Sequence, residues 1–333
     1  MGEDSDATID RIARTRAYHD GELVAENFPV ANLSDHLAEH DVVWVDLCAP
    51  DTVDLKVVAE ELGLHELAVE DAVEHRQRPK LDHYRTHDFL SMYSVWLDRD
   101  NGELSLSELA VFITPMALVT VRKDDRFDVE GVIKRWDGAS DLAHDNVGFL
   151  LYGLIDFVVD GHFQCVQDLD EEIETLEDLL FDERSRDTEV QRRSFELRKS
   201  LVNLRRVVLP MREVVNTLMR RDSKAIGDQM GPYFQDVYDH VLRATEWTES
   251  LRDLVTTILE TNLTIQGNRL NVITKQVTSW AAIIAVPTAI TGFYGQNVPF
   301  PGFAQAHGFI TSSVLIVVLS GLLYIVFRRK GWL

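Results

Sequence analysis

The residues best placed to do chemistry form a short polar stretch between two long apolar runs near the end of the chain. Gly295, Gln296 and Asn297 separate the run 277–294 from the run 309–327, and neither run contains a charged residue. Side-chain amides and backbone carbonyls offer oxygen ligands, which hard cations such as Mg²⁺ prefer, and a ring of neutral oxygens suits a hydrated Mg²⁺ ion. We interpret the stretch as a candidate selectivity filter, although the tripeptide alone is a weak signal.

A second set of candidate residues lies on the helix that we expect before this stretch. Small or hydroxyl-bearing side chains recur there at spacings of three and four, which places them on one helix face. The set comprises Asn271, Thr274, Thr278, Ala281, Ala285 and Thr288, with Val277 beside them. Such a face can line a pore in a symmetric oligomer or pack closely against another helix. The two interpretations are compatible, because inward helix faces line the pore of a ring.

The two apolar runs are expected to be membrane spans. Each is about 18–20 residues long, which is enough for a helix to cross the hydrocarbon core, whereas a buried core helix of this length would normally show a polar face. Lys275 precedes the first run and residues 328–330 (RRK) follow the second, but the stretch 295–308 contains no Lys or Arg. The positive-inside rule therefore predicts cytoplasmic chain ends and an outer loop. A two-span hairpin needs oligomerisation to enclose an aqueous path.

The remainder of the chain is acidic and polar. Among 333 residues, 55 are Asp or Glu and 33 are Lys or Arg, giving a formal net charge of −22. This balance argues against nucleic acid as a partner and favours solubility or attraction of cations. The start of the chain lacks an apolar run, so no signal peptide is expected and the soluble part should stay in the cytoplasm. Motifs typical of nucleotide binding or nucleophilic catalysis are not found in a fitting context, so the protein is not expected to be an enzyme.

Periodicity predicts an α+β protein. Residues 42–47, 88–97, 105–114 and 117–122 have the apolar, β-branched character of strands, and we expect a mixed or antiparallel sheet. Residues 55–62 form an amphipathic pattern that ends at Gly63, and 146–181 and 189–221 have long helical patterns. Pro210 should kink the second of these or start a new helix. From Tyr233 to Tyr294 only Gly267 and Pro287 interrupt a single helical pattern that leads into the first span.

These patterns define eight segments. The expected order is a flexible tail over 1–20, a cytoplasmic α/β domain over 21–145, a helical hairpin over 146–230, a stalk helix over 231–276, a first span over 277–294, an outer loop over 295–308, a second span over 309–327 and a basic cytoplasmic tail over 328–333. A paired zinc site at His83 and His87 is not expected, because i,i+4 spacing brings two imidazoles together on a helix but not at the start of a strand.

Several stretches make the sequence resemble the CorA family of divalent cation channels, within the superfamily defined by two spans and a GxN motif. The matching stretches are Glu70-Asp71 with residues 77–80 (QRPK), residues 233–240 (YFQDVYDH), residues 251–253 (LRD), Asn268 with Asn271 and Lys275, the GxN tripeptide, and residues 329–333 (RKGWL). Together they extend from about residue 40 to the end of the chain. This resemblance implies a funnel-shaped homopentamer in which the first spans line the pore and the second spans surround them.

The resemblance also implies roles for individual residues. Gly295 and Asn297 match the family's filter, and Asn271 and Thr288 match polar rings in the pore. In the cytoplasm, Asp71 and Asp236 of the partner subunit match a pair that holds a regulatory Mg²⁺. Glu70 is a weaker candidate beside Asp71.

The chain also departs from the family's usual pattern. Gln296 stands where the filter commonly has Met, and the loop 298–308 lacks the usual acidic residue. Thr274, Val277 and Ala285 stand where the family has the bulky side chains of its hydrophobic gate.

The expected function is a Mg²⁺ channel of the inner or plasma membrane, with Co²⁺ and Ni²⁺ as further candidate ions. The alternatives are a Zn²⁺ transporter of the same superfamily, with or without proton coupling, and a membrane-anchored sensor or scaffold that conducts nothing.

Overall fold

The structure is a computed structural model that describes residues 13–39, 41–74, 77–98, 102–138, 147–181, 187–220, 228–296, 299, 302–303 and 305–333. The chain divides into two compact units, residues 1–258 (unit 1) and 259–333 (unit 2). Helix α8 (Gly231–Tyr294) contributes residues to both units. The predicted segment boundaries at 145 and 230 both fall inside unit 1, because the sheet and the helices that follow it share one core.

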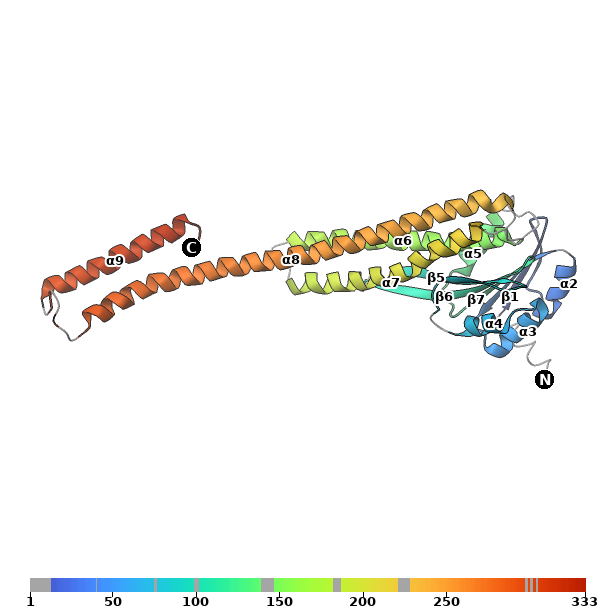
Figure 1. Ribbon diagram of the computed structural model, residues 1–333, viewed down its shortest axis with the longest axis horizontal. Coiled ribbons are helices and arrows are strands. Elements are labelled where there is room, and N and C mark those ends of the chain that lie inside the picture. Colours follow the sequence, from blue (N-terminus) through green and yellow to red (C-terminus); the bar gives the residue numbers. More distant parts are fainter. Residues whose placement is uncertain are drawn as a thin grey trace. The chain divides into compact units, whose positions relative to one another are not determined.

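Unit 1 contains a seven-stranded mixed sheet in the described part of the chain (Figure 1). Its order is β2-β1-β3-β7-β6-β5-β4. The strands are β1 (Ala13–His19), β2 (Glu22–Glu26), β3 (Val42–Cys48), β4 (Lys80–His83), β5 (Asp88–Asp98), β6 (Glu103–Ile113) and β7 (Ala117–Arg122). Strands β3 and β7 are parallel, and the other neighbouring pairs are antiparallel. The prediction of strands near 42–47, 88–97, 105–114 and 117–122 is confirmed.

Strand β1 corrects the predicted flexible tail. Residues 13–19 were expected to belong to that tail, but they form a strand between β2 and β3. Ala17 and Tyr18 are buried on opposite faces of the sheet. Arg16 is also buried, and its guanidinium lies 3.1 Å from the Asp137 carboxylate. The charged residues of β1 obscure the strand pattern in the sequence, because they stand where a buried strand usually has apolar residues. In the folded chain their long side chains reach ion-pair partners, and the backbone pairs with the neighbouring strands.

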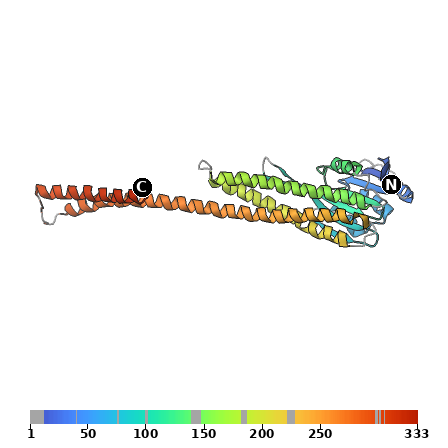
Figure 2. The ribbon, with the colours of Figure 1, turned by 90° about the horizontal axis from the view of Figure 1, so that it is seen from above.

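The two faces of the sheet carry different layers of helices. Along β3, Val43, Val45 and Leu47 pack on one side, and Val42 and Trp44 pack on the other. The first side is covered by η1 (Val30–Asn32), α2 (Leu33–Ala38), α3 (Thr52–Leu62) and α4 (Glu66–Val73). The second side is covered by α5 (Val129–Gly138), α6 (Gly148–Phe181), α7 (Asp187–Arg220), η3 (Asp228–Met230) and the start of α8 (Figures 1 and 2). Both faces of the central strands are therefore buried.

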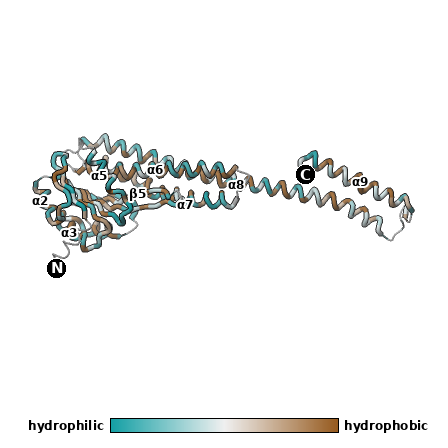
Figure 3. The backbone as a smooth tube through the Cα atoms, turned by 180° about the vertical axis from the view of Figure 1, so that it is seen from behind, coloured by the Kyte–Doolittle hydropathy of each residue, from teal (hydrophilic) through white to brown (hydrophobic). Residues whose placement is uncertain are grey.

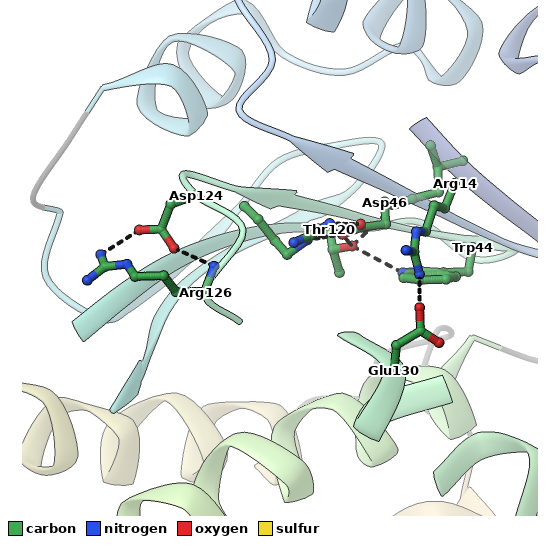
Figure 4. Close-up of polar contacts among 9 residues, drawn as sticks. Arg14, Trp44, Asp46, Thr120, Asp124, Arg126 and Glu130 are labelled. Atoms are coloured by element: carbon green, nitrogen blue, oxygen red, sulfur yellow. Dashed lines mark hydrogen bonds and ion pairs between the residues drawn. The ribbon is translucent and has the colours of Figure 1, made fainter. Parts of the chain in front are cut away.

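A buried ion pair joins the two parallel strands. Asp46 on β3 is fully buried, and the Arg122 guanidinium on β7 donates to its carboxylate at 2.8–3.1 Å. The Thr120 hydroxyl also donates to Asp46 at 2.7 Å and accepts from the Trp44 indole at 3.1 Å (Figure 4). Losing one partner would leave an unpaired buried charge, which costs about 3–5 kcal/mol. The network therefore fixes the register of β3 against β7.

Helices α6 and α7 enclose an apolar cluster with β5 and residues 244–258 of α8. Leu169, Ile173 and Leu176 of α6 are completely buried there, together with Leu201 and Leu204 of α7. Helix α7 continues through Pro210, so the alternative in which this proline starts a new helix is wrong. The predicted stop at Gly63 is confirmed, since this residue ends α3 with a φ of 62°, which a glycine adopts without strain.

His162 is the single histidine of α6 and is completely buried. Its ring Nε2 donates to the Tyr93 carbonyl of β5 at 2.7 Å. Burial lowers the pKa of His162 to about 4, which outweighs the raising effect of that hydrogen bond. The folded protein therefore holds this imidazole neutral well below pH 6.

The substitution His162→Gln is expected to weaken the acid sensitivity of unit 1. In the unfolded chain an imidazole has a pKa near 6.5, so between about pH 6.5 and 4 only the unfolded state binds this proton. The wild-type protein keeps its full stability above that range and loses roughly 3 kcal/mol as the pH falls through it. Urea unfolding of the full-length protein in detergent, followed by tryptophan fluorescence at several pH values, measures the difference. Equal pH slopes for the two proteins would contradict this assignment.

Candidate ion pathway and cation sensor

Two helices of the described chain are apolar, long and uncovered. By length and composition, α6, α8 and α9 (Ala306–Arg329) could each cross a membrane. The apolar window of α6 is 61% buried inside the protein, whereas those of α8 and α9 are 6% and 0% buried. Figure 3 shows hydrophobic residues along much of α9. Helix α6 is therefore a core helix, and the other two have the bare apolar surface that lipid covers. They contain the two predicted spans.

Helix α9 lies alongside the final part of α8 within unit 2 (Figures 1 and 2). The Trp280 and Tyr324 ring centroids are 6.4 Å apart across this contact. The more covered face of α8 carries Ser279, Ile283, Val286 and Ile290. The seven predicted pore-lining residues are all exposed and lie on the opposite face of the helix: Asn271, Thr274, Val277, Thr278, Ala281, Ala285 and Thr288. Their face is free for contact with water or with another copy of the chain.

The hydroxyl groups on this face are held by their own helix. The Thr274 and Thr288 hydroxyls donate to the carbonyl oxygens of Leu270 and Ile284 at 2.8 and 3.0 Å. A threonine that donates in this way still has an oxygen that can accept a hydrogen bond. The face therefore offers acceptors to a hydrated cation without leaving unsatisfied donors in an apolar helix.

The glycine of the candidate filter stands at the end of α8. Its backbone N–H donates to the Thr291 carbonyl at 2.9 Å, and a Cβ at Gly295 would lie only 2.9 Å from that same oxygen. A side chain at this position would therefore force the backbone to move. Gln296 follows as an exposed residue, while Asn297 lies outside the described residues. The role of these three residues stays a prediction.

The far end of the loop is also closely packed. Gly302 has a φ of 89°, and a Cβ at Gly308 would lie 2.4 Å from the Gly302 carbonyl oxygen. Helix α9 begins at Ala306, three residues before the predicted start of the second span at 309. It begins there because the chain turns at Gly302, and the Gly308 N–H reaches the Gln305 carbonyl at 3.1 Å.

The Asp71 carboxylate of α4 forms an ion pair with a lysine of its own subunit. The Lys80 ammonium on β4 donates to Asp71 at 2.6 Å and also lies 2.7 Å from Asp82. Gln77 adds a weaker hydrogen bond to Asp71 at 3.4 Å. Partial burial lowers the pKa of Lys80, but the hydrogen bonds to Asp71 and Asp82 outweigh it and the pKa is raised. Lys80 therefore stays charged at neutral pH, and a metal ion at Asp71 must share this carboxylate with it.

Glu70 points to a different surface from the Asp71 contacts. It lines an acidic groove between α3 and α4, to which Glu60, Glu66 and Glu74 also contribute. Lys56 is the basic residue of that lining. The groove surrounds Glu70 with negative charge, which attracts cations. The recorded ion pairs of Lys80 are instead with Asp71 and Asp82.

Asp236 is exposed on α8 and belongs to an acidic neighbourhood that sequence reasoning missed. Asp156 of α6 lies close enough to Asp236 for the two charges to interact, and burial raises the pKa of Asp156, with Asp160 and Asp236 adding to the effect against Arg135 and His240. Arg135 forms ion pairs with both Asp156 and Asp160. In the sequence, the i,i+4 spacing of Asp156 and Asp160 could have indicated that these two carboxylates lie together. No such spacing indicates Arg135, because it comes from another helix. Within one subunit, Asp71 and Asp236 therefore have separate sets of partners.

His83 and His87 also have separate partners. His83 forms an ion pair with Asp88, whereas His87 is buried and stacks on Tyr84, with ring centroids 4.9 Å apart. Burial lowers the pKa of His87, despite the opposing effect of Asp88. The structure gives these imidazoles structural contacts at the edge of the sheet.

The fold is a mixed sheet covered by long helices, and one of these, α8, ends together with α9 as a pair of bare apolar helices. This arrangement is typical of an integral membrane protein. The family described as CorA-like Mg²⁺ transporter protein matches residues 39–329. The chain belongs to the CorA family and is a divalent metal ion transporter rather than an enzyme. The resemblance seen in the sequence is thereby confirmed.

Individual relatives agree with this assignment. The cobalt/magnesium transport protein CorA of Thermotoga maritima is 29% identical over 294 residues, covering 87% of this chain and 83% of that protein. The zinc transport protein ZntB of Yersinia enterocolitica is 23% identical over 243 residues, covering 73% of each. The complete structure of the CorA magnesium transporter from Methanocaldococcus jannaschii superposes with a TM-score of 0.76 at 22% identity, covering 97% of this chain and 99% of that one. The last comparison shows the fold.

Proposed function

We propose that the protein is a Mg²⁺ channel, with Co²⁺ and Ni²⁺ as further permeant ions. The observation that carries this proposal is the exposed face of α8, where small and hydroxyl-bearing side chains lie opposite the face covered by α9. A neutral, oxygen-bearing surface suits an ion that keeps its water shell, as Mg²⁺ does. The name of the Thermotoga relative supports Mg²⁺ and Co²⁺ as cargo.

The proposed pore needs several copies of the chain. One α8–α9 pair cannot surround water, so we propose a homopentamer in which five α8 helices bring this face together and five α9 helices face lipid. Gly295, Gln296 and Asn297 would form the filter at the outer end, and both chain ends would lie in the cytoplasm. The inside-negative potential then drives entry, with about 2.3 kcal/mol per charge for each 100 mV, or roughly 4–5 kcal/mol for a divalent ion.

The proposed gate responds to cytoplasmic Mg²⁺. Asp71 and Asp236 of the partner subunit would hold the ion between subunits, with Glu70 nearby, and the bound ion would offset carboxylate repulsion. Bound Mg²⁺ would favour the closed state, and its loss would let the subunits separate and the pore open. The exposure of Asp236 within an acidic neighbourhood supports this role.

Zinc transport is the second candidate function. The specific observation in its favour is the similarity to zinc transport protein ZntB of Yersinia enterocolitica. The replacement of the filter's usual Met by Gln296 also leaves selectivity open.

Ion flux into liposomes distinguishes these functions. Purified full-length protein is reconstituted, and Mg²⁺, Co²⁺, Ni²⁺ and Zn²⁺ uptake is measured with an inside-negative potential, with and without a pH gradient. If the protein is a Mg²⁺ channel, Mg²⁺ uptake should increase with the inside-negative potential and should not depend on the pH gradient. Uptake of Zn²⁺ alone, driven by the pH gradient, would establish the zinc function. If the proteoliposomes take up none of these ions, both transport functions are contradicted, and a sensor or scaffold is the remaining alternative.

A further inference from the structure

A cluster of two histidines and two carboxylates lies in unit 1, where strand β1 ends and strand β3 begins. His19 ends β1, His36 lies in α2, Glu39 follows that helix, and Asp41 immediately precedes β3. His36, Glu39 and Asp41 offer ligand atoms that all lie within 4.8 Å of one another. His19 joins them through Asp41. Three potential ligands therefore lie close together, and His19 holds the other oxygen of Asp41.

Asp41 is the centre of this cluster. Its side chain is only 5% exposed, and its two carboxylate oxygens receive different imidazoles. His19 Nδ1 lies 2.9 Å from Oδ1, and His36 Nδ1 lies 3.1 Å from Oδ2. Because an ionised carboxylate only accepts, each of these nitrogens must carry a proton in the metal-free protein. A metal ion could replace the proton between His36 Nδ1 and Asp41 Oδ2, while His19 keeps its hydrogen bond to Oδ1.

The spacing fits a small tetrahedral ion. Zinc bonds of about 2.0–2.1 Å to nitrogen and about 2.0–2.2 Å to oxygen, at a tetrahedral angle, place the two ligand atoms about 3.3–3.4 Å apart. The observed separation of 3.1 Å between His36 Nδ1 and Asp41 Oδ2 needs to widen by only a few tenths of an ångström. His36 is already fixed by the Phe28 ring, with centroids 4.2 Å apart. Ion binding would therefore require little rearrangement.

The ligand types decide which ions this cluster would accept. Imidazole nitrogen suits Zn²⁺, Co²⁺ and Ni²⁺, whereas Mg²⁺ takes oxygen ligands and keeps much of its water. The carboxylates of Glu39 and of Asp20, which lies 3.9 Å from His19 Nε2, add negative charge around the histidines. His19 and His36 precede residue 39, where the match to the CorA family begins. Glu39 and Asp41 lie at the very start of that match, so the family match covers only part of the cluster.

We propose that His36, Glu39 and Asp41, with His19 positioning the Asp41 carboxylate, form a binding site for a borderline transition-metal ion such as Zn²⁺, Co²⁺ or Ni²⁺. The site would tie the β1–β2 hairpin to α2 and to the start of β3. It would bind these ions in the presence of excess Mg²⁺, and it would do so whether or not the same ions pass through the pore.

Zinc calorimetry on the full-length protein in detergent, with Mg²⁺ in large excess, tests the site. The wild-type protein is expected to bind one Zn²⁺ per chain that Mg²⁺ does not displace. His36→Ala should weaken this binding by at least roughly 10–100-fold, and Glu39→Gln, which changes an exposed side chain, should weaken it less. Replacing Zn²⁺ with Co²⁺ should give the visible absorption of a tetrahedral nitrogen and oxygen site, and that absorption should be lost in His36→Ala.

His83→Ala is the matched control, because it removes another histidine that pairs with an aspartate at the opposite edge of the sheet. This variant should keep the Mg²⁺-resistant Zn²⁺ binding. Thermal unfolding of each metal-free variant shows whether it is folded, and added Zn²⁺ should raise the midpoint of wild type and His83→Ala but not of His36→Ala. Unchanged Zn²⁺ binding in both His36→Ala and Glu39→Gln, or displacement of Zn²⁺ by Mg²⁺, would overturn the proposal. Because binding is measured without flux, this result is independent of the proposed channel function.

Discussion

Asn297→Ala is expected to reduce Mg²⁺ flux into proteoliposomes by at least about 100-fold. In the proposed pentamer this substitution removes a ring of five amides from the filter at once. A hydrogen bond contributes about 0.5–1.5 kcal/mol, so the loss of five weakens ion binding by roughly 2.5–7.5 kcal/mol. Since each 1.4 kcal/mol is tenfold, even the lower limit is close to 100-fold. Initial uptake rates at a fixed potential measure the effect.

Asn268→Ala provides the matched control for this experiment. Asn268 is an exposed asparagine of the same helix α8, but it lies away from the predicted pore face. Its substitution should leave most of the flux intact while removing the same chemical group. Comparable flux in wild type and Asn297→Ala would show that the ions do not cross through an asparagine ring, and the filter assignment would then be wrong.

The second large effect concerns the cytoplasmic sensor, where two substitutions should act in opposite directions. Asp236→Ala is expected to raise the Mg²⁺ concentration needed for half-maximal inhibition of flux by about 5- to 150-fold, the usual range of coupling between two sites. Transport itself should remain, because Asp236 is not part of the proposed filter. Lys80→Met is expected to lower that concentration, because it removes the ammonium that occupies Asp71 at 2.6 Å.

Methionine is chosen at position 80 because Lys80 also packs over the Phe89 ring, with its Nζ 5.8 Å from the centroid. A charge at about 4 Å in water contributes about 1 kcal/mol, so the expected shift is roughly fivefold. Lys134→Met, which neutralises an exposed lysine of α5, should leave the inhibition curve in place. Flux through patches or liposomes is recorded over a series of internal Mg²⁺ concentrations. If Asp236→Ala and Lys80→Met shift the Mg²⁺ concentration for half-maximal inhibition in the same direction, Lys80 and Mg²⁺ do not compete for Asp71.

The membrane helices and most strands could be predicted because their signals are local. A run of uncharged residues is visible at 309–327, and the β-branched runs at 42–47 and 117–122 are visible without any partner. Strand β1 could not be predicted in this way, because Arg14 and Arg16 give its sequence a polar character. Arg14 pairs with Glu130 (Figure 4). Arg16 pairs with Asp137. Both partners lie more than a hundred residues further on, and these ion pairs stabilise the charged side chains on that strand.

The candidate sites also divide into features with a local sequence signal and features that depend on the fold. Asp71 and Asp236 were identified through resemblance to a family, but the contact between Asp71 and Lys80 depends on how α4 meets β4. The His19, His36 and Asp41 cluster has no sequence motif, since its members come from a strand, a helix and a loop. His36, Glu39 and Asp41 are close in sequence, but only the pairing of β1 with β3 brings His19 to Asp41, so spacing along the chain carries no signal of that contact.

The burial of α6 also bears on the number of membrane crossings in the proposed topology. Three helices of the described chain are long and apolar enough to cross, and three crossings would leave the two ends of the protein on opposite sides. Because α6 gives most of its apolar surface to the core of unit 1, lipid has little of that surface left to cover. In the proposed topology α8 and α9 cross, and this even number returns the chain to the compartment it left. The packing of α6 on the sheet would thereby set the side of the bilayer on which residues 328–330 end.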